Sequence, residues 1–131
     1  MLYVTVKRAK FKGISGPVNL PYGTQVECEN GFIRKDGKKI CRITSHNAHE
    51  FFSPDDDGNG LERGKLVQAI KKTLENRDAE YQARWDKVWE DGLCQKYKRV
   101  EHEDFWLWNH EFFCAPMCDL WHIARLVGAN I

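Results

Sequence analysis

Two dipeptides in the first third of the chain, Asn30-Gly31 and Asp36-Gly37, most strongly limit what this sequence can fold into. Both central residues of the tightest hairpin turns need positive φ, and Asn-Gly and Asp-Gly adopt that conformation readily. β-Branched residues recur in the segments around both dipeptides. The pattern therefore predicts a small antiparallel β meander, with strands near residues 2–7, 24–29, 32–35 and 38–43.

After Ile43 the apolar residues recur with the period of a helix. Thr44 or Ser45 can cap a short helix through residues 46–52. A second helix is predicted over about 61–76 and a third between Asp78 and Gly92. The apolar stripes of these two helices are Leu66, Val67, Ile70 and Leu74 in the first, and Tyr81, Trp85, Val88 and Trp89 in the other.

The last third of the chain is rich in aromatic residues and predicts two helical pieces divided near Pro116, the second ending at Gly128. The chain as a whole is predicted to be one α+β domain over residues 1–131, β-rich over 1–43 and helical over 44–131. It would hold a small N-terminal antiparallel β meander followed by three to five helices.

The charges almost cancel, with 20 Lys and Arg against 19 Asp and Glu. A general nucleic-acid binder normally shows a clear basic excess, so nucleic acid is not the favoured partner, although a local basic patch remains compatible with this total. The start of the chain becomes basic after six residues, unlike a signal peptide, and no apolar run is long enough to cross a bilayer. These features predict a cytoplasmic protein.

Four soft-metal ligands follow one another at four-residue intervals, namely His110, Cys114, Cys118 and His122. On one straight helix the first and last would lie about 18 Å apart, so a shared ion requires a bend, which Pro116 can supply. With four protein ligands a zinc ion would be structural. Alternatively the two cysteines are small core residues. The residues that could replace one of the four are Cys94, His102, Cys28 and Cys41.

Two further clusters have weaker signals. The segment from Asp55 to Gly60 begins like a calcium loop, but Leu66 stands where the bidentate glutamate is required, so an acidic turn is the better interpretation. Arg63 and Lys65 could pair with its carboxylates. His46 and His49 lie one helical turn apart and, with this acidic loop, could form the centre of a metal-dependent nuclease or phosphodiesterase.

A basic stretch in the second half of the chain is a candidate surface for partner binding. Lysine and arginine interleaved with aromatic residues can hold phosphates or an acidic protein patch, and an exposed tryptophan would be a suitable anchor. A solvated helix face is the alternative interpretation. The candidate partner-binding residues are Lys96, Tyr97, Lys98, Arg99 and Trp106.

The segments "ITSHNAHEFFSPDDDGNGLERGKLVQAI" and "RWDKVWEDGLCQKYKRVEHEDFWLWNHEFF", which fall within Ile43–Phe113, resemble small proteins of phages and prophages of Gram-positive bacteria. Some small phage proteins block host immunity, including anti-CRISPR proteins that bind the guide-RNA effector nuclease. The resemblance implies a non-enzymatic inhibitor that acts by protein contact in the host cytoplasm, and it supplies no catalytic residues. A metal-dependent enzyme and a DNA-associated regulator remain the alternatives.

Overall fold

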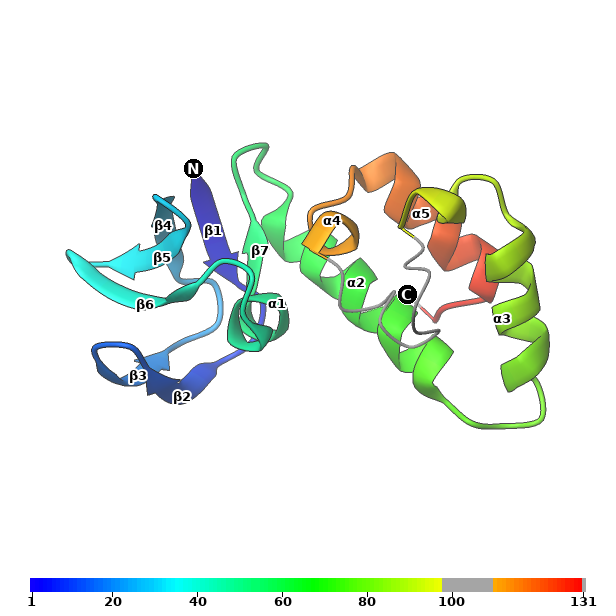
Figure 1. Cartoon of the computed structure of the whole chain (residues 1–131), viewed down its shortest axis with the longest axis horizontal. Helices are drawn as coiled ribbons and strands as arrows, with labels where there is room; N and C mark the ends of the chain where they lie inside the picture. The colour runs from blue at the N-terminus through cyan, green and yellow to red at the C-terminus, as the bar shows by residue number, and fades with distance from the viewer. Residues whose placement is uncertain (98–109, 131) are drawn as a thin grey trace. The chain divides into compact units, whose positions relative to one another are not determined.

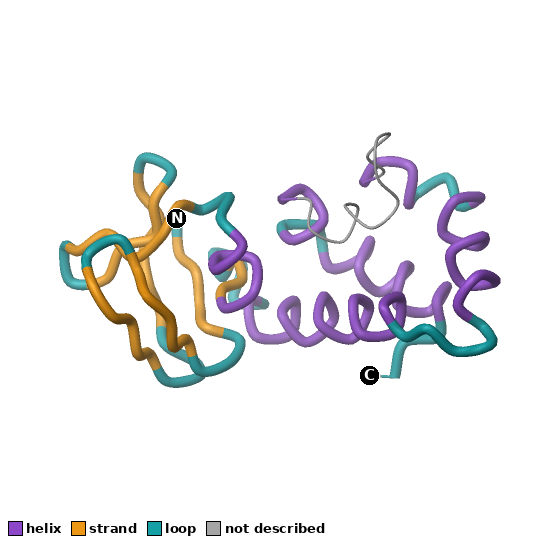
Figure 2. Tube along the Cα trace, turned by 60° about the horizontal axis from the view of Figure 1, so that its bottom comes forward, coloured by secondary structure: helices purple, strands orange, loops and turns teal. Residues whose placement is uncertain are grey.

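The computed structural model describes residues 1–97 and 110–130 (Figure 1). The chain divides into two compact units, Met1–Gly64 and Lys65–Ile131, and the single domain expected over residues 1–131 stays a prediction. The first unit is built mainly from strands and the second from helices, as the colouring in Figure 2 shows. The predicted α+β class is confirmed, with an antiparallel meander followed by five α-helices in the described part of the chain.

The first unit, called the β unit below, contains a five-stranded antiparallel sheet. Both predicted hairpin turns are present, because φ is +53° at Asn30 and +80° at Gly31, and +52° at Asp36 and +79° at Gly37. In sheet order the strands are β6 (Lys38–Arg42), β5 (Phe32–Lys35), β4 (Gln25–Glu29), β1 (Leu2–Thr5) and β7 (Phe52–Pro54).

The pairing of β5 with β6 contains one bulge. Ile33 pairs with Cys41, but the next residue, Arg34, pairs with Lys39, so Ile40 is an extra residue in β6. A bulge of this kind breaks the alternation of side chains along the strand. Ile40 and Cys41 are accordingly both buried, although they are adjacent in the sequence.

The bulge also positions a second hairpin, formed by β2 (Ala9–Gly13) and β3 (Gly16–Leu20). The carbonyl oxygen of Ile40 accepts a hydrogen bond from the backbone N–H of Ile14, at 3.0 Å. This approach requires Gly13, because a Cβ at that position would lie 2.8 Å from the same oxygen. The tip of the β2–β3 hairpin is therefore fixed to β6 through backbone atoms.

The short helix α1 (His46–Phe51) follows the sheet and leads into β7. Its N-terminus is capped by the Ser45 hydroxyl, which accepts a hydrogen bond from the N–H of Ala48 at 3.1 Å. The predicted cap is confirmed. The cap fixes where the helix begins, because it satisfies one of the N–H groups that have no partner inside the helix.

Helix α2 (Gly60–Glu75) begins in the β unit, where two glycines one turn apart face valine side chains. A Cβ on Gly60 would lie 2.5 Å from Val4 Cγ1, and a Cβ on Gly64 would lie 2.1 Å from Val6 Cγ1. Both distances are far below van der Waals contact. The start of α2 can therefore lie against the N-terminal strand only because these two positions have no side chain.

The second unit, called the helical unit below, buries the predicted apolar face of α2. Helix α3 (Tyr81–Glu90) buries Trp85 and Val88, and the indole N–H of Trp85 donates to the carbonyl oxygen of Leu74 at 3.1 Å. The predicted stripe of α2 is confirmed as a packing face, and that of α3 is confirmed for Trp85 and Val88, whereas Tyr81 and Trp89 are half-buried. The buried residues of the α2 face are Leu66, Val67, Ile70 and Leu74.

The C-terminal region holds the short helices η1 (Cys94–Tyr97) and α4 (His110–Phe113), then α5 (Met117–Val127). Pro116 stands directly before α5, and Gly128, at φ +70°, ends it. The predicted break near Pro116 and the predicted end at Gly128 are both confirmed. Proline fits here because the first N–H groups of a helix have no internal partner.

Candidate functional site

The charge of the β unit is strongly segregated along the sequence. Residues 7–42 carry nine Lys and Arg and three Asp and Glu, a net charge of +6, so the remainder of the chain carries −5. The near-neutral total therefore conceals a basic segment, although the acidic residues of 50–62 bring the net charge of the whole β unit to +2. The field of a basic segment attracts anionic partners over about a Debye length, roughly 8 Å at physiological salt.

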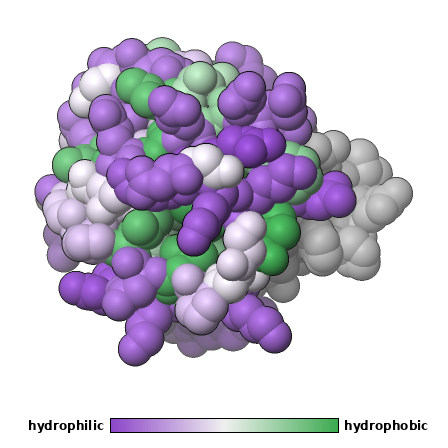
Figure 3. Space-filling model, turned by 90° about the vertical axis from the view of Figure 1, so that its left-hand side faces the viewer, coloured by the Kyte–Doolittle hydropathy of each residue, from purple (hydrophilic) through white to green (hydrophobic). Residues whose placement is uncertain are grey.

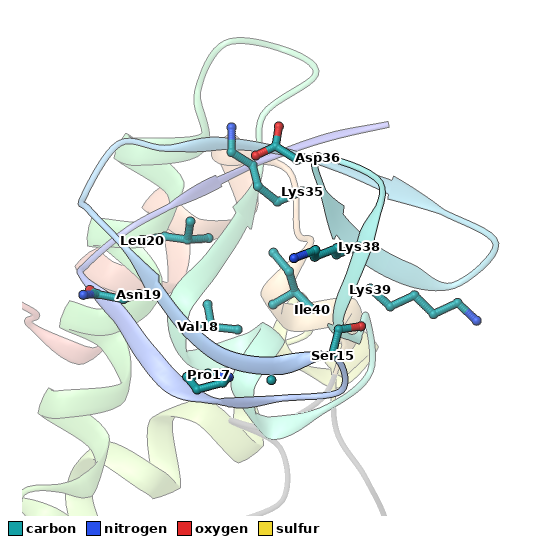
Figure 4. Close-up of a pocket in the computed structure, with 11 residues that line it drawn as sticks. Ser15, Pro17, Val18, Asn19, Leu20, Lys35, Asp36, Lys38, Lys39 and Ile40 are labelled. Atoms are coloured by element: carbon teal, nitrogen blue, oxygen red, sulfur yellow. The ribbon is translucent and has the colours of Figure 1, made fainter.

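A groove lies between the β2–β3 hairpin and the β5–β6 hairpin, with a cavity volume of about 300 Å³. Its floor is formed by Val18, Leu20 and Ile40, which Figure 4 shows directed into the same space. We call it the β groove. On the face of the molecule in Figure 3, apolar atoms lie near the centre and hydrophilic side chains frame them.

The rim of the β groove is lysine-rich. Lys35, Lys38 and Lys39 line it together with one acidic residue, Asp36. Within residues 1–97 and 110–130, Lys35 and Lys38 form no ion pair. In Figure 4 the ammonium group of Lys38 points across the groove and that of Lys39 points away from it. The groove therefore offers unpaired cations beside an apolar floor.

The ammonium group of Lys39, which points away from the groove, lies over an aromatic ring. Lys39 Nζ lies 4.3 Å from the centre of the Phe32 ring, and the guanidinium carbon of Arg42 lies 5.5 Å from it. Such cation–π contacts are worth about 0.5–1 kcal/mol at exposed positions. Of the three rim lysines, Lys35 and Lys38 are thus the ones left to meet a ligand.

The predicted metal ligands lie in and around α4 and α5, and the structure brings two of them together. Cys114 Sγ lies 3.6 Å from His110 Nε2. Cys118 is exposed, and His122 Nε2 lies 3.0 Å from a carboxylate oxygen of Asp91. No group of three or more possible ligands occurs within the described ranges. Four-ligand binding would require His122 to leave Asp91, so zinc stays a prediction.

Metal analysis tests that prediction. If the four side chains bind zinc, untagged protein should retain about one zinc per chain after dialysis, and a chelator should lower its melting temperature by many degrees, since structural zinc is worth roughly 10–16 kcal/mol in small peptides. Cys114→Ser should abolish retention, whereas Cys28→Ser should not. Protein that holds no zinc and melts at the same temperature with chelator would contradict the prediction.

Two carboxylates, one half-buried and one buried, connect α3, η1 and α5 inside the helical unit. Asp91 accepts hydrogen bonds from the N–H of Cys94 at 3.0 Å and contacts His122. Burial opposes ionisation of Asp91, but these contacts outweigh it and lower the pKa of its carboxyl. Burial, with this carboxylate alongside, raises the pKa of the Cys94 thiol to about 12. Cys94 is therefore a neutral core residue.

The second carboxylate is Asp119, which accepts a hydrogen bond from the Tyr97 hydroxyl at 2.6 Å. That bond is the main reason why the pKa of Asp119 is lowered, and Lys96 Nζ, 3.7 Å away, adds to it. Burial and this carboxylate together raise the pKa of Tyr97 above its ordinary value. The Tyr97 hydroxyl therefore stays protonated and donates its hydrogen bond to Asp119 at all ordinary pH values.

Tyr97→Phe should lower the free energy of unfolding by about 1.5–3 kcal/mol, because it removes a hydrogen bond to a buried ionised group. Denaturant unfolding followed by tryptophan fluorescence measures this. Tyr22→Phe is the matched control, since Tyr22 is 52% exposed, and it should change stability by less than about 0.5 kcal/mol. Equal stability of the two variants would contradict a stabilising role for the Tyr97–Asp119 pair.

The predicted partner-binding stretch is described only in part. Lys96 is exposed, whereas Tyr97 is buried to 5% exposure and hydrogen-bonded to Asp119. Lys98, Arg99 and Trp106 lie outside the described residues. Of the two described members, only Lys96 presents its side chain to solvent.

The acidic loop is organised by hydrogen bonds within the protein. Asp55 Oδ1 accepts from the N–H of Gly60 at 2.9 Å, and Asp57 is paired with the buried guanidinium of Arg63 at 2.5 Å. The predicted pairing of Arg63 with this loop is confirmed. His49 is buried, and His46 lies 3.2 Å from a carboxylate oxygen of Glu50.

The signal that leads to the β groove is present in the sequence but is easily overlooked. It is the concentration of nine basic residues in 7–42, which the near-zero total charge hides. The convergence of β3 with β6 depends on the bulge at Ile40 and has no sequence signature.

No helix within the described residues is both long and apolar enough to cross a membrane. No protein-family model, curated protein or solved structure matches the chain.

Proposed function

We propose that this protein is a non-catalytic binding protein that docks a partner protein on the β groove. The observation that carries the proposal is the groove itself, in which an apolar floor lies beside Lys35 and Lys38, two lysines that form no ion pair with any residue the structure describes. Protein interfaces combine an apolar centre with a polar rim in this way. Binding of a partner at the β groove needs no chemical step. It requires only that apolar surface is buried on the floor and that acidic groups of the partner pair with the lysines.

The resemblance to small phage proteins supports a more specific form of the proposal. In that form the partner is a host defence protein, and a CRISPR effector nuclease in the host cytoplasm is the leading candidate. The protein would inhibit its target by occupying a functional surface. A charged rim suits this role, because complementary charge raises the rate of encounter and excludes wrong partners.

Affinity capture from a lysate of a Gram-positive host tests the proposal. Wild-type protein should retain a partner that the Lys35→Glu/Lys38→Glu double variant loses. The Lys65→Glu/Lys72→Glu double variant is the matched control, because it makes the same charge change at exposed positions of α2 and should retain the partner. A partner retained equally by all three proteins would show that the β groove is not the docking surface.

A further inference from the structure

The β groove differs from a nucleic-acid groove in what forms its floor. The described residues that line it include no aromatic side chain, and the floor is aliphatic. Proteins that bind single strands combine basic residues with aromatic rings on which bases stack, worth about 1–3 kcal/mol per base. In the β groove the lysine ammonium groups could pair with the phosphate of a nucleotide, but no aromatic ring among the described lining residues could stack on its base. An aliphatic or aromatic side chain, in contrast, would bury apolar surface against Val18, Leu20 and Ile40.

The size of the groove limits the occupant as well. Its volume of about 300 Å³ is at the lower end of the range typical of ligand pockets, roughly 300–1,000 Å³. That space suits one large side chain and not a whole amphipathic helix. The occupant is therefore an extended segment that inserts a single anchor residue, with the neighbouring residues of the segment crossing the rim.

The rim determines the charge of those neighbours. Lys35 and Lys38 have no carboxylate partner within the described residues, and Asp36 is the one acidic side chain among the lining residues. Both hairpins that form the groove lie within residues 7–42, a segment with a net charge of +6. A segment with carboxylates on both sides of the anchor would complement this charge, whereas a basic segment would be repelled.

Resting on the proposed function, we infer that the β groove binds an extended acidic segment of a partner protein, with one large apolar side chain between carboxylates. The apolar side chain enters the groove over Ile40. The flanking carboxylates pair with Lys35 and Lys38. Because both lysines are on the rim, charge governs the rate of association, and burial of the anchor governs the lifetime of the complex.

Fluorescence anisotropy with a labelled synthetic peptide tests this inference on the whole 131-residue chain. The probe has one leucine between two short runs of glutamate. Replacing the leucine by glycine should weaken binding about tenfold, and replacing every glutamate by glutamine should weaken it at least as much. Lys35→Glu/Lys38→Glu should weaken binding of the original peptide more than about tenfold, and Lys65→Glu/Lys72→Glu less than about twofold.

The other outcomes separate this inference from the proposed function. A labelled oligothymidine that binds more tightly than the peptide, and loses binding in Lys35→Glu/Lys38→Glu, would overturn the assignment of the partner class while leaving the groove as a binding surface. Absence of peptide binding at millimolar protein also overturns it, and the capture experiment then decides the proposed function on its own. Peptide binding that does not depend on leucine would reduce the interaction to unspecific charge and would likewise overturn the inference.

Discussion

Replacing Gly64 by alanine should lower the free energy of unfolding by about 3 kcal/mol, the upper end of the usual cost of overpacking. The new Cβ would lie 2.1 Å from Val6 Cγ1 and 2.6 Å from Val6 Cβ. Val6 has little freedom to withdraw, because its side chain is β-branched and its backbone N–H donates to the carbonyl oxygen of Phe51 at 2.9 Å. The higher helix propensity of alanine, about 1 kcal/mol, offsets only part of this cost.

Two further variants show whether the clash is the cause. Gly92→Ala is the control, since a Cβ on Gly92 would meet no atom of the described residues within 4 Å apart from its chain neighbours, and it should change stability by less than about 0.5 kcal/mol. Val6→Gly removes every side-chain atom that the new Cβ would meet, so it should restore more than half of the loss when combined with Gly64→Ala, a coupling that a double-mutant cycle measures. Urea unfolding followed by circular dichroism gives all four values. A Gly64→Ala protein as stable as the wild type would show that α2 does not lie against Val6.

Local signals in the sequence predicted much of this fold. The turns at Asn30-Gly31 and Asp36-Gly37 need positive φ, which few residue pairs supply, so their positions could be predicted from residue type alone. The helices were equally accessible, because their apolar stripes, the Ser45 cap and the Gly128 stop are all short-range features.

Three strands were not predicted, and each for a physical reason. In β2 the alternation of Ala9, Lys10, Phe11 and Lys12 is regular but short, and Pro17 lowers the strand signal of β3. β7 has three residues, ends in proline and directly follows α1, so no periodicity can develop. β2 and β3 pair with each other in a local hairpin, whereas β7 gains its strand conformation by pairing with the distant β1, which the sequence pattern does not report.

The candidate site depends on such distant pairings even more. The bulge that directs Ile40 into the β groove is a shift of register between two strands, and period-two alternation cannot reveal it. Pairing of His122 with Asp91 joins residues 31 positions apart. Residue type alone suggests a metal ligand at His122, whereas the fold supplies a carboxylate as its neighbour.

The second large effect is expected at Arg63, whose side chain is 6% exposed. Its guanidinium donates to the carbonyl oxygen of Pro54 at 2.6 Å and to both carboxylate oxygens of Asp57, at 3.3 and 2.5 Å. Arg63→Met keeps most of the aliphatic stem and removes every donor. The free energy of unfolding should fall by about 2–3 kcal/mol near pH 7, less than for a fully buried ion pair because Asp57 is half exposed and can be rehydrated.

This loss should depend on pH in a defined direction. The hydrogen bond from Arg63 is the main cause that lowers the pKa of Asp57 from 3.8 to about 2. As the pH falls, the Asp57 carboxylate is therefore protonated in the unfolded chain before it is protonated in the folded protein. Its contribution to the free energy of unfolding is fully present above about pH 5 and is lost as the pH falls to about 2. In Arg63→Met the pKa should return toward 3.8, so the stability gap between variant and wild type should narrow over this range.

Denaturant unfolding at a series of pH values between about 5 and 2 measures this gap. The other carboxylates titrate alike in both proteins, so their contributions cancel in the difference. Lys72→Met, at an exposed position of α2, is the control and should show a small difference that does not change with pH. A gap for Arg63→Met that stays constant down to pH 2 would mean that Asp57 takes no part in the pair. The stabilisation by Arg63 would then come from its hydrogen bond to Pro54 alone, and the acidic loop would be held by Asp55 and its bond to the first N–H of α2.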